Sequence, residues 1–181
     1  MNFREFLNDE YIERIRIPED RDYVNGLRCN RNERVSIWDK NFIQKLMSDI
    51  DQYDMTLYPD LSKIYDAIAK HEALKKENIL IGSGIDGIIK NIFETFTHEG
   101  MKIGVLSPTY AMYYVYSKLF KTELRTIGYD YQNFKLDRRK LRHSLSEVSI
   151  LFIPNPNQPV EDNLDLKEMG DLALECNKRK N

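Results

Sequence analysis

Residues 79–93 read ILIGSGIDGIIKNIF and combine a strand pattern, a glycine cluster and a helix pattern. The first residues favour a strand, and the apolar residues from Ile85 to Phe96 recur at helical spacing, as on one buried helix face. The glycines let the backbone approach a ligand closely, and the first N–H groups of a helix carry a partial positive charge. The stretch therefore predicts a strand, a turn and a helix N-terminus that can bind an anion.

The same turn has two other interpretations. A short strand-to-helix connection without any ligand is common in α/β domains. Gly82, Gly84 and Gly87 also match the dinucleotide-binding pattern, which places an acidic residue at the end of the next strand to bind a ribose hydroxyl. The next predicted strand, residues 102–106, ends in Ser107-Pro108 instead. Because the carboxylate is missing, a nicotinamide dinucleotide is the weaker interpretation.

Composition limits the class of protein. The chain has 181 residues, enough for one hydrophobic core. Its formal net charge of −2 does not indicate the basic surface that nucleic-acid-binding proteins carry. No apolar stretch is long enough to span a bilayer, and charges interrupt the apolar residues at the N-terminus, unlike in a signal peptide. Cys29 and Cys176 are far apart, and histidines are few. We therefore expect a cytoplasmic protein with free thiols and with no metal, membrane or nucleic-acid partner.

The first third of the chain is predicted to be helical. Helices are expected over residues 2–17, over 39–53 and from Pro59 onward. The apolar side of the second should be buried, and its members are Phe42, Ile43, Leu46, Met47 and Ile50. We expect an N-terminal arm and helical segment over residues 1–55 and a partial cofactor-binding α/β domain over 56–181.

Strands and helices alternate after the glycine turn. Strands are expected over 103–106, 123–127 and 148–153, the last of them fully buried because its apolar run is continuous. Helices are expected over 111–120, 137–144 and 165–178. This alternation is typical of an α/β fold, in which helices cover both faces of a mostly parallel sheet.

Three segments should meet at the carboxyl edge of that sheet, where ligands bind in such folds: residues 82–87, 107–113 and 155–159. Tyr110 and Tyr113 lie one helical turn apart and can stack on a flat heterocycle, although tyrosines at such positions are often simply packed. The third segment presents the amides of Asn155, Asn157 and Gln158. These amides can donate to a ligand, or they can serve only the backbone of a rigid turn.

Five motifs occur in a familiar order: NRNE at 30–33, LYPD at 57–60, GSGID at 82–86, SPTYAMY at 107–113 and NPNQP at 155–159. With them, residues 27–169 resemble the N-terminal half of a pyridoxal-phosphate-dependent aminotransferase of fold type I. The histidinol-phosphate aminotransferase branch is the most similar. The resemblance implies part of the large domain of that fold, pyridoxal 5'-phosphate as cofactor, an amino acid or amino acid-like substrate and a homodimer.

The resemblance also implies roles for individual residues. The backbone of Gly84, Ile85 and Asp86 would hold the cofactor phosphate, and Tyr113 would stack on the pyridine ring. Gln158 would donate to the phenolic oxygen of the cofactor. Two further sites would lie elsewhere: Tyr58 would reach the phosphate of a partner subunit, and Asn32 and Glu33 would lie near the substrate channel.

The chain departs from the family pattern at several positions. Gln158 replaces an asparagine, and Val160-Glu161 replaces Thr-Gly. Ile85 replaces a small residue or serine, so a hydroxyl donor to the phosphate is lost while the backbone donor remains. Gly87 replaces an acidic residue of the histidinol-phosphate branch, which argues against that substrate.

The largest departure concerns the reacting groups. The Schiff-base lysine, the aspartate that holds the pyridine nitrogen and the arginine for the substrate carboxylate come later in the family than residue 181. We therefore assign no catalytic residue and expect this chain alone to be an inactive fragment of an amino-group transferase. A non-catalytic binding or dimerisation module of the same fold is the alternative.

Overall fold

The computed structural model describes residues 33–34, 36–160 and 162–178. These residues form two compact units, each of which is described by itself. The first comprises 81–160 with 162–178 and contains the sheet, and the second comprises 33–34 with 36–80. The predicted helix over residues 2–17 lies outside the described residues.

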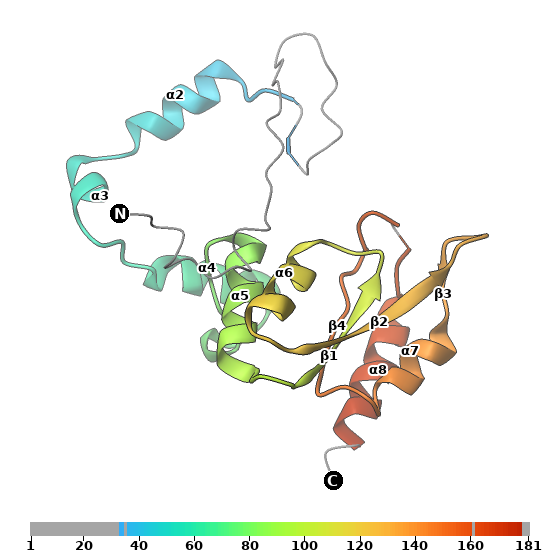
Figure 1. Cartoon of the computed structure of the whole chain (residues 1–181). Coiled ribbons are helices and arrows are strands. Elements are labelled where there is room, and N and C mark those ends of the chain that lie inside the picture. The colour runs from blue at the N-terminus through green and yellow to red at the C-terminus, as the bar shows by residue number, and fades with distance from the viewer. Residues whose placement is uncertain (1–32, 35, 161, 179–181) are drawn as a thin grey trace, which may run out of the picture. The chain divides into compact units, whose positions relative to one another are not determined.

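The first unit is an α/β sandwich built on a four-stranded sheet (Figure 1). The strands lie in the order β3-β2-β1-β4. β1 pairs in parallel with β2 and β4, and β3 pairs antiparallel with β2. The bounds of the strands are β1 Lys102–Ser107, β2 Glu123–Asp130, β3 Lys135–Leu136 and β4 Ile150–Phe152.

Helices cover both faces of this sheet, which confirms the predicted fold class. α5 (Gly84–Phe96) and α6 (Met112–Leu119) pack on one face, and α7 (Arg138–Ser144) and α8 (Leu166–Lys178) pack on the other (Figure 1). The side chains of β1 alternate between the two cores, because Ile103 and Val105 face α5 and α6 while Leu106 faces α7 and α8. Gly104 of β1 lets the side chain of Leu151 on the neighbouring β4 lie close to the backbone, since a Cβ atom at residue 104 would lie 2.8 Å from Cδ1 of Leu151.

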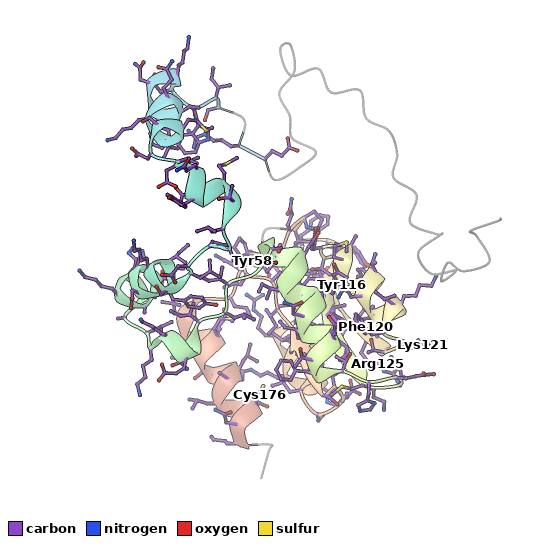
Figure 2. The ribbon with its side chains drawn as sticks, turned by 90° about the vertical axis from the view of Figure 1, so that its left-hand side faces the viewer. Tyr58, Tyr116, Phe120, Lys121, Arg125 and Cys176 are labelled. Carbon is purple, nitrogen blue, oxygen red and sulfur yellow. The ribbon has the colours of Figure 1, made fainter. Side chains whose placement is uncertain are left out.

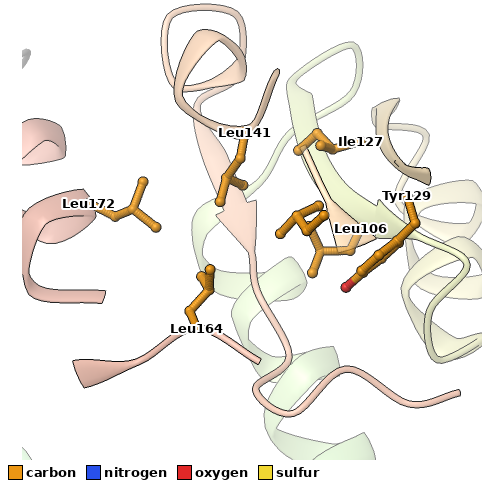
Figure 3. Packing of buried hydrophobic residues seen from close by; sticks show 7 residues of the cluster. Leu106, Ile127, Tyr129, Leu141, Leu164 and Leu172 are labelled. Carbon is orange, nitrogen blue, oxygen red and sulfur yellow. The ribbon is translucent and has the colours of Figure 1, made fainter. Parts of the chain in front are cut away.

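Each face has its own hydrophobic cluster. The cluster under α7 and α8 is shown in Figure 3, and its buried members are Leu106, Ile127, Tyr129, Leu136, Leu141, Leu164 and Leu172. The cluster under α5 and α6 is aromatic and centres on Phe93, whose side chain is fully buried. Its ring stacks on Phe152 and Phe120 at centroid distances of 5.2 and 6.1 Å and lies 6.1 Å from that of Tyr116. Figure 2 labels Tyr116 and Phe120, which come from α6 and the turn after it.

Two strand predictions need correction. β4 is only partly buried, because it is the last strand of the described sheet and has β1 on one side only. Residues 79–81 form no strand, although Ile79 has extended backbone angles of −118° and 130°. A strand exists only where a neighbour pairs with it, and the described sheet does not extend to this segment.

The helix face predicted from Ile85 to Phe96 is buried only in its middle. Ile89 and Phe93 of α5 lie in the core, whereas Ile85 and Phe96 are each 64% exposed. The apolar period therefore predicted the helix correctly but overestimated how much of it the described residues cover.

The second unit consists of short helices: α2 Lys40–Ser48, α3 Gln52–Thr56, α4 Ser62–Glu72 and the 3-10 turn η2 Lys76–Asn78. The single helix expected over 39–53 is wrong, because Asp51 caps a new helix by accepting hydrogen bonds from the N–H groups of Tyr53 and Asp54. The predicted burial of its apolar side is also wrong. That side is exposed, with Phe42 at 42% and Met47 at 63%, and no described residue of α2, α3 or α4 is buried.

Across both units, every described helix is too short or too polar to reach from one side of a bilayer to the other.

Candidate functional site

The three segments predicted to meet at the sheet edge do so, through side-chain hydrogen bonds. The hydroxyl of Tyr110, after β1, donates to Oδ1 of Asp86 in the first turn of α5 at 2.7 Å. The hydroxyl of Thr109 donates to Oδ1 of Asn157, after β4, at 2.7 Å. Nδ2 of Asn157 donates in turn to the carbonyl of Pro108 at 2.8 Å. The helix N-terminus, the tyrosine segment and the proline-rich segment therefore form one continuous edge.

The first turn of α5 is open to an anion. Gly84 has a φ angle of +70°, which glycine adopts at little cost, and its N–H donates to the carbonyl of Gly82 at 2.8 Å. The side chain of Ser83 makes no capping hydrogen bond, and no described residue accepts from the backbone N–H groups of Ile85 and Asp86. These N–H groups and the positive end of the helix dipole suit a phosphate.

Tyr113 lies deeper than a stacking surface would. It is 7% exposed and packs on Phe152 at a centroid distance of 5.1 Å, as the packing alternative anticipated. Burial raises the pKa of its hydroxyl above the ordinary value of 10.0. Tyr110 meets Tyr113 edge-on at 6.5 Å and is itself 39% exposed, so the more open ring of the pair is Tyr110. Stacking by Tyr113 stays a prediction.

Asn157 joins the segments of this edge and is fully buried. Besides its bonds to Pro108 and Thr109, Nδ2 donates to the hydroxyl of Tyr129 on β2 at 2.9 Å. All the polar atoms of the side-chain amide are therefore used within the protein, and none is left for a ligand. No local sequence signal indicates this role, because Tyr129 and Pro108 are 28 and 49 residues away in the chain.

The other two amides of the segment have different surroundings. Asn155 serves the backbone, as its Oδ1 accepts from the N–H of Leu164 at 2.9 Å and its Nδ2 donates to the carbonyl of Leu164 at 3.0 Å. Gln158 is exposed, and its side chain makes no hydrogen bond with any described residue. Of the three amides considered from the sequence, Gln158 is the one that can donate to a bound molecule.

The remaining predicted residues lie in the second unit or outside the described residues. Tyr58 is fully exposed and belongs to the second unit, as does Glu33, which is also exposed (Tyr58 is labelled in Figure 2). Asn32 lies outside the described residues. In the described part of the chain, no group of histidine, cysteine, aspartate or glutamate side chains is arranged to hold a metal ion.

The chain is similar in sequence to known aminotransferases. The family model described as "Aminotransferase class I and II" matches residues 35–181. A histidinol-phosphate aminotransferase of Sulfurimonas denitrificans is 36% identical over 118 residues, which are 64% of this chain and 32% of that protein. A histidinol-phosphate aminotransferase of Clostridium beijerinckii is 29% identical over 163 residues, or 89% of this chain and 43% of that protein.

The fold is also found in solved structures. The histidinol-phosphate aminotransferase of Sinorhizobium meliloti, in complex with pyridoxal-5'-phosphate, superposes with a TM-score of 0.66 at 18% identity. The match covers 76% of this chain and 37% of that one. The chain thus spans well under half the length of the relatives that it matches.

Proposed function

Because the chain belongs to the class I and II aminotransferases, we propose that it is the cofactor-phosphate part of a pyridoxal-phosphate-dependent aminotransferase. Such an enzyme transfers an amino group between an amino acid or amino acid-like donor and a 2-oxo acid. One observation carries the proposal: the open first turn of α5 lies at the same sheet edge as Tyr110 and Asn157, and hydrogen bonds join the three segments. We further propose a cytoplasmic homodimer.

The residues present fit the phosphate of this cofactor and offer one exposed amide to its ring. The N–H groups of Ile85 and Asp86, beside the left-handed Gly84, would hold the phosphate. Tyr113 would lie against the ring, and the exposed amide of Gln158 would donate to its phenolic oxygen. When bound, pyridoxal phosphate supplies an electron sink for charge that develops at the substrate α-carbon. Tyr58 of the second unit would serve a partner subunit, and Glu33, together with Asn32, would line the substrate channel.

The backbone donor of Ile85 can be tested directly. Ile85→Pro removes this N–H in the first helical turn, where proline fits, whereas Ile85→Ala keeps the N–H and shortens an exposed side chain. Loss of one donor is expected to weaken pyridoxal 5'-phosphate binding by about threefold to tenfold in the proline variant only. Isothermal titration and phosphorus NMR measure the affinity.

Two outcomes would count against this assignment. Equal affinity in the two variants would mean that the Ile85 N–H does not bind the phosphate. Tighter binding of a nicotinamide dinucleotide than of pyridoxal phosphate would restore the dinucleotide interpretation of the glycine pattern.

Lys90 and Lys121 have the ordinary setting of surface lysines. Lys90 lies on α5 and binds Glu94 at 2.9 Å, and Lys121 lies 3.9 Å from Glu99 with an exposed side chain. An exposed lysine is mostly protonated at neutral pH and is a poor nucleophile. We therefore propose that these 181 residues alone do not catalyse transamination.

Lysine labelling tests this proposal. Incubation with pyridoxal 5'-phosphate followed by borohydride reduction is expected to label several lysines, each at a small fraction of one label per chain. Peptide mapping by mass spectrometry measures the distribution, and an amino-donor assay measures turnover. One lysine labelled stoichiometrically, together with turnover of any amino acid, would show that the chain contains a catalytic centre.

A non-catalytic association module is the second candidate, and the exposed apolar side of α2 favours it. The two candidates differ when the C-terminal part of a class I and II aminotransferase is supplied in trans. An enzyme half is expected to regain turnover, whereas an association module will not.

A further inference from the structure

Asp162 is a buried carboxylate that the proposed cofactor chemistry does not use. It lies between β4 and α8, and its side chain is 6% exposed. Its Oδ2 accepts from the backbone N–H of Leu136 and from Nη1 of Arg138, both at 2.9 Å. Its Oδ1 lies 3.4 Å from Nζ of Lys135. The segment after β4 is thereby attached to the corner between β3 and α7.

At this corner, each nitrogen of the Arg138 guanidinium donates at least one hydrogen bond. Besides Asp162, it donates to the carbonyl of Leu136 at 3.1 Å and to the carbonyl of Asn163 at 3.0 Å. Its Nε donates to Oε1 of Glu168, at the start of α8, at 3.1 Å. Only the planar fork of an arginine reaches acceptors in so many directions, since a lysine is a single point charge.

A backbone bond connects this corner to the proposed cofactor segment. The N–H of Asn157 donates to the carbonyl of Asp162 at 3.2 Å, and the two residues form an isolated antiparallel bridge. The Asn157 side chain then binds the segment after β1 through Pro108 and Thr109. Gln158 is therefore the residue next to a point that is fixed from both sides.

The two carboxylates bound by Arg138 have lowered pKa values. Burial disfavours ionisation of Asp162, but hydrogen bonds from the N–H of Leu136, from Arg138 and from Lys135, together with the charge of Arg138, outweigh it and hold its pKa below 3.8. Glu168 also has a lowered pKa, because Arg138 binds it. Both carboxylates stay charged at neutral pH, so neither contact is lost there.

We propose that Arg138 and Asp162 are positioning residues that place Gln158 for the ring end of the cofactor, and this rests on the proposed function. The carboxylate holds the backbone of residue 162, that backbone holds Asn157, and Asn157 sets where the next side chain projects. The corner between β3 and α7 thus acts on the cofactor without touching it.

The chain offers a matched control for Arg138. Arg142 lies one turn later on α7 and binds Glu175 of α8 at 2.9 Å, as Arg138 binds Glu168, but no contact with Asp162 is described for it. Arg138→Met and Arg142→Met each remove one arginine of α7 and one ion pair to α8. Only the first also removes contacts to the segment that precedes α8.

The first measurement needs no cofactor. Hydrogen exchange of the full chain is expected to be about tenfold faster at the amides of Asn157 and Leu164 in Arg138→Met than in Arg142→Met. Arg138→Lys is expected to lie between wild type and Arg138→Met, and it serves if the methionine variant does not fold. Equal exchange at these amides in all the variants would overturn the positioning role.

The second measurement separates the ring end from the phosphate end. Arg138→Met is expected to weaken binding of pyridoxal 5'-phosphate by about threefold to tenfold while inorganic phosphate binds as in wild type. Added to Gln158→Ala, the same substitution is expected to cause no further loss, because both changes remove the same hydrogen bond. Additive losses, or an equal loss for inorganic phosphate, would contradict the proposal.

Absence of pyridoxal phosphate binding in the wild-type chain would instead refute the proposed function. The hydrogen-exchange result would still decide whether Arg138 positions the segment.

Discussion

Replacing Phe93 by alanine is expected to lower the free energy of unfolding by about 3–5 kcal/mol, which is among the largest effects that one core substitution produces. The side chain is fully buried and its ring lies against those of Phe120 and Phe152. The substitution removes these contacts and leaves a cavity between α5 and the sheet. A domain with an ordinary margin of about 5–15 kcal/mol would lose much of its stability.

Urea unfolding followed by circular dichroism measures this change. Phe96→Ala is the matched control, since it removes the same ring from the same helix at a position that is 64% exposed. We expect less than about 1 kcal/mol for it, as for most surface substitutions. Similar losses in the two variants would mean that α5 does not pack on the sheet as described.

Asn157→Leu is expected to cost about 3 kcal/mol or more, because it removes an amide but leaves its buried partners in place. The hydroxyl groups of Thr109 and Tyr129 and the carbonyl of Pro108 would each lose a hydrogen bond. Thermal unfolding measures the loss. Thr109→Val removes only one of these bonds and should cost about 1 kcal/mol.

The neighbouring residue provides the contrast. Gln158 is exposed and makes no hydrogen bond within the described residues, so Gln158→Leu is expected to change stability by less than about 0.5 kcal/mol. The same variant should weaken pyridoxal 5'-phosphate binding. If Gln158→Leu were as destabilising as Asn157→Leu, the separation between a structural and a ligand-binding amide would be wrong.

The helices and paired strands of the α/β unit were predictable because their signals are local. Apolar period and caps place α6, α7 and α8 within a residue or two of the expected ranges. Where a property depends on a distant neighbour, the same reasoning fails. Residues 79–81 have the composition of a strand, but pairing decides whether a strand forms.

The candidate site shows the same limit. The glycine turn predicted an open helix N-terminus at Gly84, and α5 begins there. The sequence could not predict which amide after β4 forms hydrogen bonds within the protein, because the partners of Asn157 lie on β2 and after β1. The buried Asp162 and its partner Arg138 have no sequence pattern at all, since their contact depends on how the segment before α8 packs against the corner between β3 and α7.

The position of β4 beside β1 also has a consequence for the order of folding. β1 pairs with β2 across one short crossover, as in Lys102 with Glu123, whereas Ile103 and Ile150 are more than twice as far apart in the chain. Closing the longer loop costs more chain entropy, so β4 is expected to dock after β1, α6 and β2 have assembled. The buried amide of Asn157 finds its partners only in that last step. The ligand edge should therefore appear late and all at once, and substitutions there should speed unfolding more than they slow folding.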